Sequence, residues 1–381
     1  MTSEPDKPNL RDAAHAQEDA YLETLTTLAN FESPTGQKAA VDALMDHLEG
    51  DLSARGWRVE RVAKEEVGDQ LVARKSFPGK TSSLLLTHAD TVWSVGTLEK
   101  MPIKRDGDLF YGPGTLDMKA GIAAGIHAVE LLEEMKLEPQ GPVTLLITSD
   151  EEVGSKHSRD LIERLAPEHD RAFVLEPGRD DGALKVGRKG VGAFYVRFEG
   201  QSAHAGNNPK DGASALRELA HFLLFVESLN DDESQTSVNL TVAHGGSVGN
   251  VISEEAFAEV DLRALEDGEG KRVERAVYGY EPKDSRVKVH VTGGLNRPPM
   301  EPTEQNMALF EEAKRKMEGL GFTLDSAVVG GGSDGNLTSA LGVPTLDGLG
   351  SSGRGPHARF EHIRVSETLD RLALLTALLT K

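Results

Sequence analysis

Histidine and carboxylate side chains in five short segments are the residues of this chain whose types and spacing could do chemistry. The segments read L-L-L-T-H-A-D, G-T-L-D-M-K, T-S-D-E-E-V-G-S, V-L-E-P-G and G-P-H-A-R-F-E. Imidazole nitrogens and carboxylate oxygens are ligands that zinc and similar divalent ions take in proteins. The segments therefore predict a metal centre whose candidate ligands are His88, Asp117, one of the pair Glu151 and Glu152, Glu176 and His357.

Three of the segments begin with an apolar run of the kind that is buried in a parallel sheet. Residues 84–86 precede His88, residues 143–148 precede the adjacent acids, and residues 172–175 precede Glu176. In open α/β sheets, ligands bind at the carboxyl ends of the strands. We therefore expect these side chains to meet at one edge of a sheet.

Glu151 and Glu152 are adjacent acids at the end of a predicted strand. Two crowded carboxylates repel each other, so they favour a shared proton or a nearby cation. Their chemistry can be divided, with one binding metal and the other accepting a proton from water. Asp90, two residues after His88, is placed to hydrogen-bond the second imidazole nitrogen and so to fix its tautomer.

Each of these residues also has an ordinary structural explanation. His88 could pack in a loop, Asp117 could cap the helix that follows it, and adjacent acids at a strand end are commonly solvated. The glycine-rich segment 330–335 could be a phosphate cradle, but it lacks the G-K-[ST] ending of a P-loop. Its backbone N–H groups could instead bind a substrate carboxylate.

The elements that must position these residues alternate between helix and strand over residues 17–149. Apolar residues recur at helical spacing near 21–29 and 41–48, and residues 57–62 alternate as a strand. Residues 120–135 predict a helix whose glycines permit close contact with a sheet. Alternation of this kind predicts an α/β fold with a mostly parallel central sheet and flanking helices.

The pattern changes after Gly190. Strands are expected at 191–198, 238–243, 256–262 and 287–291, with helices at 213–229 and 269–278. This βαββαβ order is the ferredoxin-like arrangement. We therefore expect an inserted ferredoxin-like domain over residues 188–296, and a discontinuous catalytic domain formed by residues 1–187 and 297–381.

Composition excludes several classes of function. The chain has 381 residues and no cysteine, which excludes disulfides and thiolate metal sites. Its formal net charge of −20 argues against a nucleic-acid partner, since phosphates would be repelled. No apolar run approaches transmembrane length, so no membrane partner is expected. The polar opening M-T-S-E-P-D-K-P-N lacks the features of a signal peptide, which favours a cytoplasmic protein.

A series of segments in order along the chain resembles the co-catalytic zinc exopeptidase and deacylase family. The family includes glutamate carboxypeptidase, aminoacylase, succinyl-diaminopimelate desuccinylase and aminotripeptidase, and the resemblance is closest to glutamate carboxypeptidase. It extends from about residue 20 to the end of the chain. It is carried by H-A-D-T-V, G-P-G-T-L-D-M-K, T-S-D-E-E-V-G-S, L-E-P-G, S-A-H-A-G, G-G-G-S-D-G-N and the late His357.

The resemblance implies a role for each candidate residue of the metal centre. His88 and Glu176 would hold one zinc, Glu152 and His357 the other, and Asp117 would bridge them before a cis peptide to Met118. Glu151 would be the general base and Asp90 the orienting acid. Two Zn2+ per chain are implied, with Co2+ or Mn2+ as possible replacements. Glu at position 176 resembles the carboxypeptidase and deacylase branch, because members that trim from the amino end usually have Asp there.

The inserted domain is implied to be a lid that also forms a homodimer. His204 resembles a lid histidine that reaches the site of the partner subunit. Asn250 and Arg263 resemble contacts to the substrate carboxylate, to which Gly331 would add a backbone N–H group. Arg263 could instead be a structural partner of a nearby acid. Ser253 stands where proline commonly follows N-x-I, and this departure leaves the substrate less certain than the chemistry.

These features predict a dinuclear zinc hydrolase that cleaves an amide bond next to a free α-carboxylate, in the manner of a glutamate carboxypeptidase. The expected substrate is a small peptide or an N-acyl amino acid. An N-acyl amino acid deacylase of the aminoacylase or desuccinylase type remains the alternative. A non-catalytic binding homologue is the remote alternative, although neither Glu151 nor any candidate ligand is missing.

Overall fold

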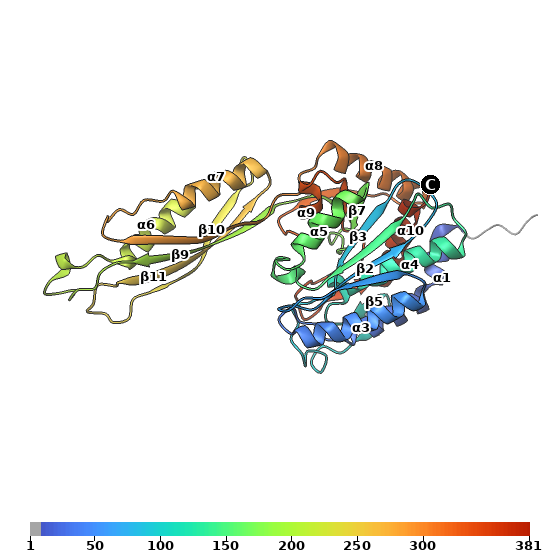
Figure 1. The fold of residues 1–381 in the computed structure, drawn as a ribbon, viewed down its shortest axis with the longest axis horizontal. Coiled ribbons are helices and arrows are strands. Elements are labelled where there is room, and N and C mark those ends of the chain that lie inside the picture. The colour runs from blue at the N-terminus through green and yellow to red at the C-terminus, as the bar shows by residue number, and fades with distance from the viewer. Residues whose placement is uncertain (1–8) are drawn as a thin grey trace, which may run out of the picture. The chain divides into compact units, whose positions relative to one another are not determined.

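The computed structural model describes residues 9–381, which form two compact units (Figure 1). The first unit contains the chain up to Val186 together with Pro302–Val328 and Ser333–Lys381. The second contains Gly187–Glu301 and Val329–Gly332. The second unit thus interrupts the first in sequence.

A large sheet forms the centre of the first unit. Its inner strands β6, β3, β7 and β14 are parallel, β1 shares their direction, and β2 and β8 run the opposite way. The inner strands are buried along their whole length because helices cover both of their faces. In sheet order the strands are β1 (Arg58–Val62), β2 (Gln70–Lys75), β6 (Val143–Thr148), β3 (Ser83–His88), β7 (Arg171–Val174), β14 (Thr345–Asp347), β8 (Leu184–Arg188) and β13 (Ser326–Val329).

The register of three strands brings the candidate ligands to one edge. His88, the last residue of β3, pairs with Thr148, the last residue of β6. On its other side β3 places Leu86 opposite Val174, the last residue of β7. Because the three strands are parallel, the chain leaves all of them at the same edge. Glu151, Glu152 and Glu176 follow within a few residues, as the sequence predicts.

Helices flank this sheet. The helix α4 is buried along most of its length, and Gly121 allows it to approach β7 closely, since a Cβ there would collide with the backbone of Leu175. A Cβ on Gly350 would collide with the same carbonyl group of Leu175. The helices of this unit are α1 (Leu10–Ala16), α2 (Glu18–Ala29), α3 (Lys38–Ala54), α4 (Ala120–Glu134), α5 (Arg159–Leu165), α8 (Glu304–Gly319), α9 (Gly335–Ala340) and α10 (Val365–Leu379).

A small antiparallel sheet supports the remaining part of the site, and the sequence analysis does not predict it. Its order is β15 (Gly353–Arg354), β16 (His362–Arg364), β5 (Leu109–Tyr111) and β4 (Lys104–Asp106). Strands of two or three residues are too short to show an alternating pattern. The loop between β15 and β16 carries His357, and β5 leads into the turn that carries Asp117.

The second unit has the predicted βαββαβ order. Its elements are β9 (Gly190–Glu199), α6 (Ala215–Glu227), β10 (Ser237–Gly245), β11 (Glu255–Ala264), α7 (Asp267–Tyr278) and β12 (Lys288–Arg297). The sheet order β10-β11-β9-β12 is that of a ferredoxin-like fold, and both helices pack on one face of the sheet (Figure 1). Buried and more exposed residues alternate along β9 and β11, because only that face meets a core.

The predicted fold class is therefore confirmed. The strands β3, β6 and β7 and the helix α4 are found close to where the sequence places them, and β6 has the predicted bounds of 143–148. The sequence analysis does not predict the inner strand β14. Within residues 9–381 we find no helix with the length and apolar character required to span a membrane.

Candidate active site

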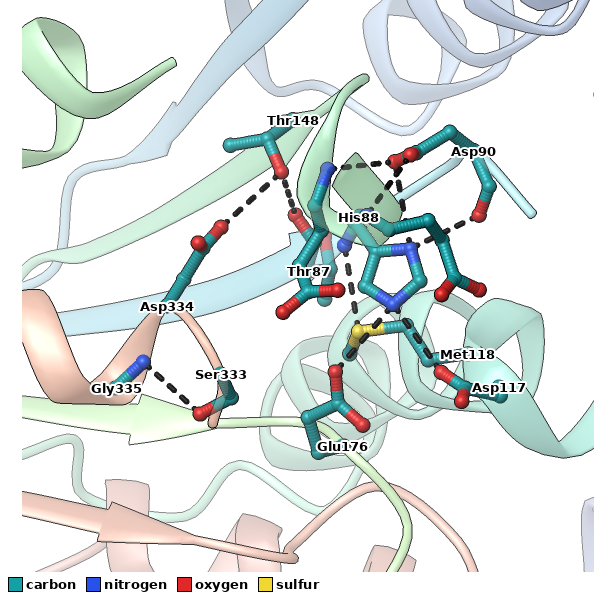
Figure 2. Close-up of polar contacts among 12 residues, drawn as sticks. Thr87, His88, Asp90, Asp117, Met118, Thr148, Glu176, Ser333, Asp334 and Gly335 are labelled. Carbon is teal, nitrogen blue, oxygen red and sulfur yellow. Dashed lines mark hydrogen bonds and ion pairs between the residues drawn. The ribbon is translucent and has the colours of Figure 1, made fainter. Parts of the chain in front are cut away.

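His88 lies at the centre of the candidate metal site (Figure 2). Its Nε2 is 3.2 Å from Oδ1 of Asp117 and 3.3 Å from Oε1 of Glu176. Its Nδ1 is 2.9 Å from the backbone carbonyl oxygen of Asp90 and 3.5 Å from Oδ1 of the same residue. The sequence predicts the carboxylate as the partner of Nδ1, whereas the nearer acceptor is the backbone carbonyl. With either acceptor on Nδ1, Nε2 is the nitrogen that would bind a metal.

Asp117 lies in a kinked turn, η1 (Thr115–Lys119), directly before α4. The peptide bond from Asp117 to Met118 is cis, as the resemblance implies. One carboxylate oxygen, Oδ1, faces His88, and the other, Oδ2, is 3.3 Å from Nε2 of His357. The two oxygens of Asp117 are thus divided between the two histidines.

His357 and Glu152 complete the cluster. The imidazole Nε2 of His357 is 3.1 Å from Oε2 of Glu152, and His357 has a positive φ of 60° at its place in the loop. The second oxygen of Glu152, Oε1, is buried and has no hydrogen-bond partner within the described part of the chain. A buried carboxylate oxygen without a partner is costly, and a cation would relieve that cost.

The separations between these atoms fit a metal centre. Two atoms that share a tetrahedral zinc, each about 2.0–2.1 Å from it, lie about 3.3 Å from each other. The four separations from the two Nε2 atoms to carboxylate oxygens are between 3.1 and 3.3 Å. An oxygen of Glu151 also lies within 4.8 Å of the ligand atoms of His88 and Glu176. The residues present therefore fit two metal positions, to each of which Asp117 would offer one oxygen.

The charges of the cluster compensate one another when no metal is bound. Burial would lower the pKa of His88, but hydrogen bonds with carboxylates, that of Asp117 first, raise it well above its ordinary value. Hydrogen bonds with Asp117 and Glu152 raise the pKa of His357 to about 10. Burial raises the pKa of Glu152. Histidine binds a metal in its unprotonated form, so metal binding at His88 and His357 would compete with proton binding.

The other predicted site residues belong to the second unit. His204 is exposed there, and its Nδ1 accepts the backbone N–H groups of Gly206 at 3.1 Å and Asn207 at 3.0 Å. These two donors require an unprotonated Nδ1, so the proton of the neutral ring lies on Nε2. Asn250 lies beside His204, because its carbonyl oxygen accepts the N–H group of Ala205 at 2.8 Å.

Comparison with known proteins decides the family. The sequence profile of peptidase family M20/M25/M40 matches residues 84–381. The chain belongs to this family. It is therefore a metallopeptidase or amidohydrolase, and the family resemblance predicted from the motifs is confirmed.

Individual relatives in sequence and in fold agree with this assignment. Carboxypeptidase G2 of Pseudomonas sp. (strain RS-16) is 33% identical over 376 residues, which are 96% of this chain and 90% of that protein. A succinyl-diaminopimelate desuccinylase of Thioalkalivibrio sulfidiphilus is 30% identical over 346 residues, 84% of this chain and 88% of that one. The solved structure of a Bacillus cereus aminopeptidase superposes with a TM-score of 0.79, at 22% identity and over 95% and 98% of the two chains.

Arg263 of this M20 protein is already engaged by a neighbouring carboxylate. Its Nε lies 3.0 Å from Oδ1 of Asp261, and its Nη2 lies 2.8 Å from Oδ2. This is the structural pairing that the sequence analysis leaves open. Gly331 accepts a hydrogen bond at its carbonyl oxygen from Nη1 of Arg188 at 3.1 Å. Neither contact tests the predicted roles toward a substrate carboxylate.

Glu361 is a buried acid to which the sequence analysis gives no role. It lies four residues after His357, and its carboxylate accepts hydrogen bonds from the turn that carries Asp117. Burial raises its pKa to about 7, although the donors around it favour the ionised form. The available signal was its place in the segment G-P-H-A-R-F-E, directly before the short strand β16 (His362–Arg364).

The part of the segment G-G-G-S-D-G-N that lies in the first unit, from Ser333 on, supports the site (Figure 2). Oδ2 of Asp334 is 3.3 Å from the hydroxyl of Thr148 at the end of β6, and Oδ1 accepts the hydroxyl of Ser155. Ser333 lies in a G-x-S-x-G sequence, as a nucleophilic serine can, but its hydroxyl donates to Asp347 at 2.6 Å. The segment therefore supports the turn that carries Glu151 and Glu152.

Proposed function

We propose that this M20 protein holds two zinc ions and hydrolyses an amide bond next to a free α-carboxylate, as a carboxypeptidase. The observation that carries the proposal is the division of the Asp117 oxygens between His88 and His357. Two metals roughly 3.5–4 Å apart are typical of hydrolases that polarise a carbonyl group while activating water. Co2+ or Mn2+ would suit the same nitrogen and oxygen ligands.

Glu152 is assigned as a ligand and Glu151 as the general base. The buried, unpartnered oxygen of Glu152 supports its assignment to metal. Bound zinc would supply charge that polarises the scissile carbonyl and makes the attacking water more acidic. Glu151 would accept the proton of that water and pass it to the leaving nitrogen, as a general base that becomes a general acid.

His204 is assigned as the donor that stabilises the developing oxyanion. Its tautomer supports this role, because the N–H groups of Gly206 and Asn207 on Nδ1 leave the proton on Nε2. An N–H donor directed at the developing charge is the element that such a site requires. The second unit would act as the lid that supplies it.

Asn250, Arg263 and Gly331 are assigned to the substrate carboxylate. Asp261 holds Nε and Nη2 of Arg263, so Nη1 is the nitrogen that would reach a substrate. An arginine held in place by a carboxylate loses less entropy when it binds a second one. The name of the Pseudomonas relative supports a carboxypeptidase, and that of the Thioalkalivibrio relative supports the alternative of an N-acyl amino acid deacylase.

The proposal includes a homodimer formed through the second unit and a cytoplasmic location. Apolar side chains exposed on α6 and β10 support a covered surface, and the most exposed of them, Leu224, is 63% accessible. Sedimentation of the purified protein would measure the oligomeric state, and cell fractionation would measure the location.

A hydrolysis screen tests the proposed activity. The zinc-loaded protein would be incubated with peptides that end in each class of residue and with N-acyl and N-succinyl amino acids. Each substrate would also be supplied with an amidated C-terminus. Release of the C-terminal residue from peptides supports the carboxypeptidase, and preference for acyl groups supports the deacylase. Turnover of amidated and free substrates at equal rates would contradict both.

A further inference from the structure

The carboxylate of Glu361 is buried and accepts four hydrogen bonds, three of them from one short stretch of backbone. Oε1 accepts the N–H groups of Leu116 at 2.9 Å and Asp117 at 3.1 Å. Oε2 accepts the N–H group of Gly114 at 3.0 Å and the indole N–H of Trp93 at 2.8 Å. Three of the four donors thus come from residues 114–117, the turn that carries the candidate bridging carboxylate.

This turn needs an external acceptor. Gly114 has a positive φ of 68°, and Asp117 has a non-helical φ of −117°. The N–H groups here precede the first turn of a helix, so they lack the carbonyl partners that a helix would supply. Buried N–H groups must be paired, and Glu361 is the acceptor for three of them.

The short segment from His357 to Glu361 contacts Asp117 at two points. Nε2 of His357 lies 3.3 Å from Oδ2 of Asp117, and Oε1 of Glu361 accepts the Asp117 N–H group. The pairing of His362 with Tyr111 places β16 beside β5, which fixes the two segments relative to each other. Asp117 is thus held at its side chain by one residue and at its backbone by the other.

We propose that Glu361 is a positioning residue of the metal centre, which sets the place of Asp117 between the two metals by holding the backbone of its turn. This role rests on the proposed function, because it concerns the bridging ligand of that centre. Groups that support a ligand in this way usually change metal affinity or activity by about 10–100-fold when they are replaced.

Glu361→Gln is the variant that tests the role, because an amide has one acceptor oxygen and one NH2 donor. In either orientation the NH2 group faces two N–H donors, so two of the four hydrogen bonds are lost. Glu32→Gln is the matched control. Glu32 accepts the N–H groups of Gly96 at 2.7 Å and Leu98 at 2.8 Å, and these residues lie outside the metal-binding segments.

Calorimetric titration of metal-free protein with Zn2+ is the primary measurement, and steady-state kinetics at saturating Zn2+ is the second. Glu361→Gln is expected to bind zinc about 10–100-fold more weakly than the wild type. Its kcat should fall while KM is unchanged, since an interaction that orients the reacting groups is lost. Glu32→Gln should lose thermal stability but keep wild-type zinc affinity.

The results separate the two proposals. A wild type that binds fewer than two zinc ions overturns the metal centre and with it the role of Glu361. A wild type that binds two, beside a folded Glu361→Gln that binds them equally tightly, overturns the role of Glu361 alone. If Glu361→Gln does not fold, Glu361→Asp replaces it, since its shorter carboxylate cannot reach all four donors. Wild-type zinc affinity in Glu361→Asp would equally overturn the role.

Discussion

The side chain of Asp90 is hydrogen-bonded to the backbone of Glu152, because its Oδ2 accepts the Glu152 N–H group at 3.2 Å. Oδ1 of the same carboxylate accepts the N–H group of Glu151, also at 3.2 Å. Asp90 receives a further hydrogen bond from the hydroxyl of Thr35 at 2.8 Å. One buried carboxylate therefore connects the end of β3, where His88 lies, with the turn that holds both adjacent acids.

Asp90→Ala is expected to weaken zinc binding by about 10–100-fold, because the turn at Glu151 and Glu152 loses its acceptor and His88 loses its neighbouring charge. Metal analysis after dialysis against buffered Zn2+ would measure the loss. The wild type should retain two equivalents under the same conditions. Equal metal content in both proteins across the titration would argue against a supporting role for Asp90.

Glu151→Ala and Glu152→Ala are expected to fail in different ways. Glu151→Ala should keep both metals and lose at least about 10²–10⁴-fold in kcat, the usual cost of removing a general base. Glu152→Ala should lose metal as well as activity, since its buried carboxylate faces His357. Paired metal analysis and kinetics would check this, and the reverse pattern would exchange the two assignments.

Mixed dimers would test whether His204 acts across subunits. His204→Ala and Glu151→Ala are each expected to be inactive as homodimers. A mixed dimer has one site that combines an intact Glu151 with an intact His204 from the other chain. Activity should therefore return when the two variants are mixed and allowed to exchange subunits. Lack of recovery in a sample proved to contain mixed dimers would place His204 in its own subunit's site.

Arg263→Ala distinguishes a contact to the substrate carboxylate from a purely structural pair with Asp261. In the first case, amidating the C-terminus of the substrate should lower kcat/KM far more in the wild type than in the variant. In the second case, amidation should cost both enzymes equally. The comparison requires variant protein with a normal circular dichroism spectrum and full metal content.

His127 predicts a pH dependence of stability. It is 3% exposed, and burial, with the nearby charge of Arg55, lowers its pKa to about 4. Glu130 lies 3.4 Å from Nδ1, but its other oxygen is taken by Arg55. The folded protein thus keeps His127 neutral while the unfolded chain protonates it below pH about 6.5. The contribution of neutral His127 to the unfolding free energy is fully present above pH about 6.5 and is lost as the pH falls toward 4.

The lost stability from His127 amounts to about 2 kcal/mol between pH 7 and pH 5. Urea unfolding of metal-free wild type and His127→Gln at both pH values would measure it. Between pH 7 and pH 5, the unfolding free energy of His127→Gln should fall by about 2 kcal/mol less than that of the wild type. Between pH 7 and pH 8 the two proteins should change in parallel. An equal loss in both proteins between pH 7 and pH 5 would show that His127 is protonated in the folded state.

The sequence was informative where a buried strand ends on a polar side chain. His88 and Glu176 each follow an apolar run, so their shared edge could be predicted from parallel pairing alone. Glu361 could not be found in this way, because its partners are backbone N–H groups that appear only once the turn has formed. The small sheet of β4, β5, β15 and β16 was missed because its strands are too short to show a period.

The pairing of Arg263 with Asp261 also lies beyond sequence reasoning of this kind. The two residues are separated by one position, so their side chains point to the same face of β11. Alternation predicts that shared face but does not predict whether an arginine turns to its neighbour or to a ligand. Side-chain geometry, rather than the pattern of residue types, decided this point.

Gly121 and Gly350 enclose the carbonyl group of Leu175, the residue directly before Glu176, with no space for one additional methyl group on either side. This close packing of Gly121 and Gly350 against Leu175 resists deformation, since close-packed interiors have low compressibility. We therefore expect the frame around the metals to be rigid on the timescale of turnover. Metal uptake should then require no rearrangement of this part of the chain. Movements that accompany catalysis would have to occur elsewhere in the protein.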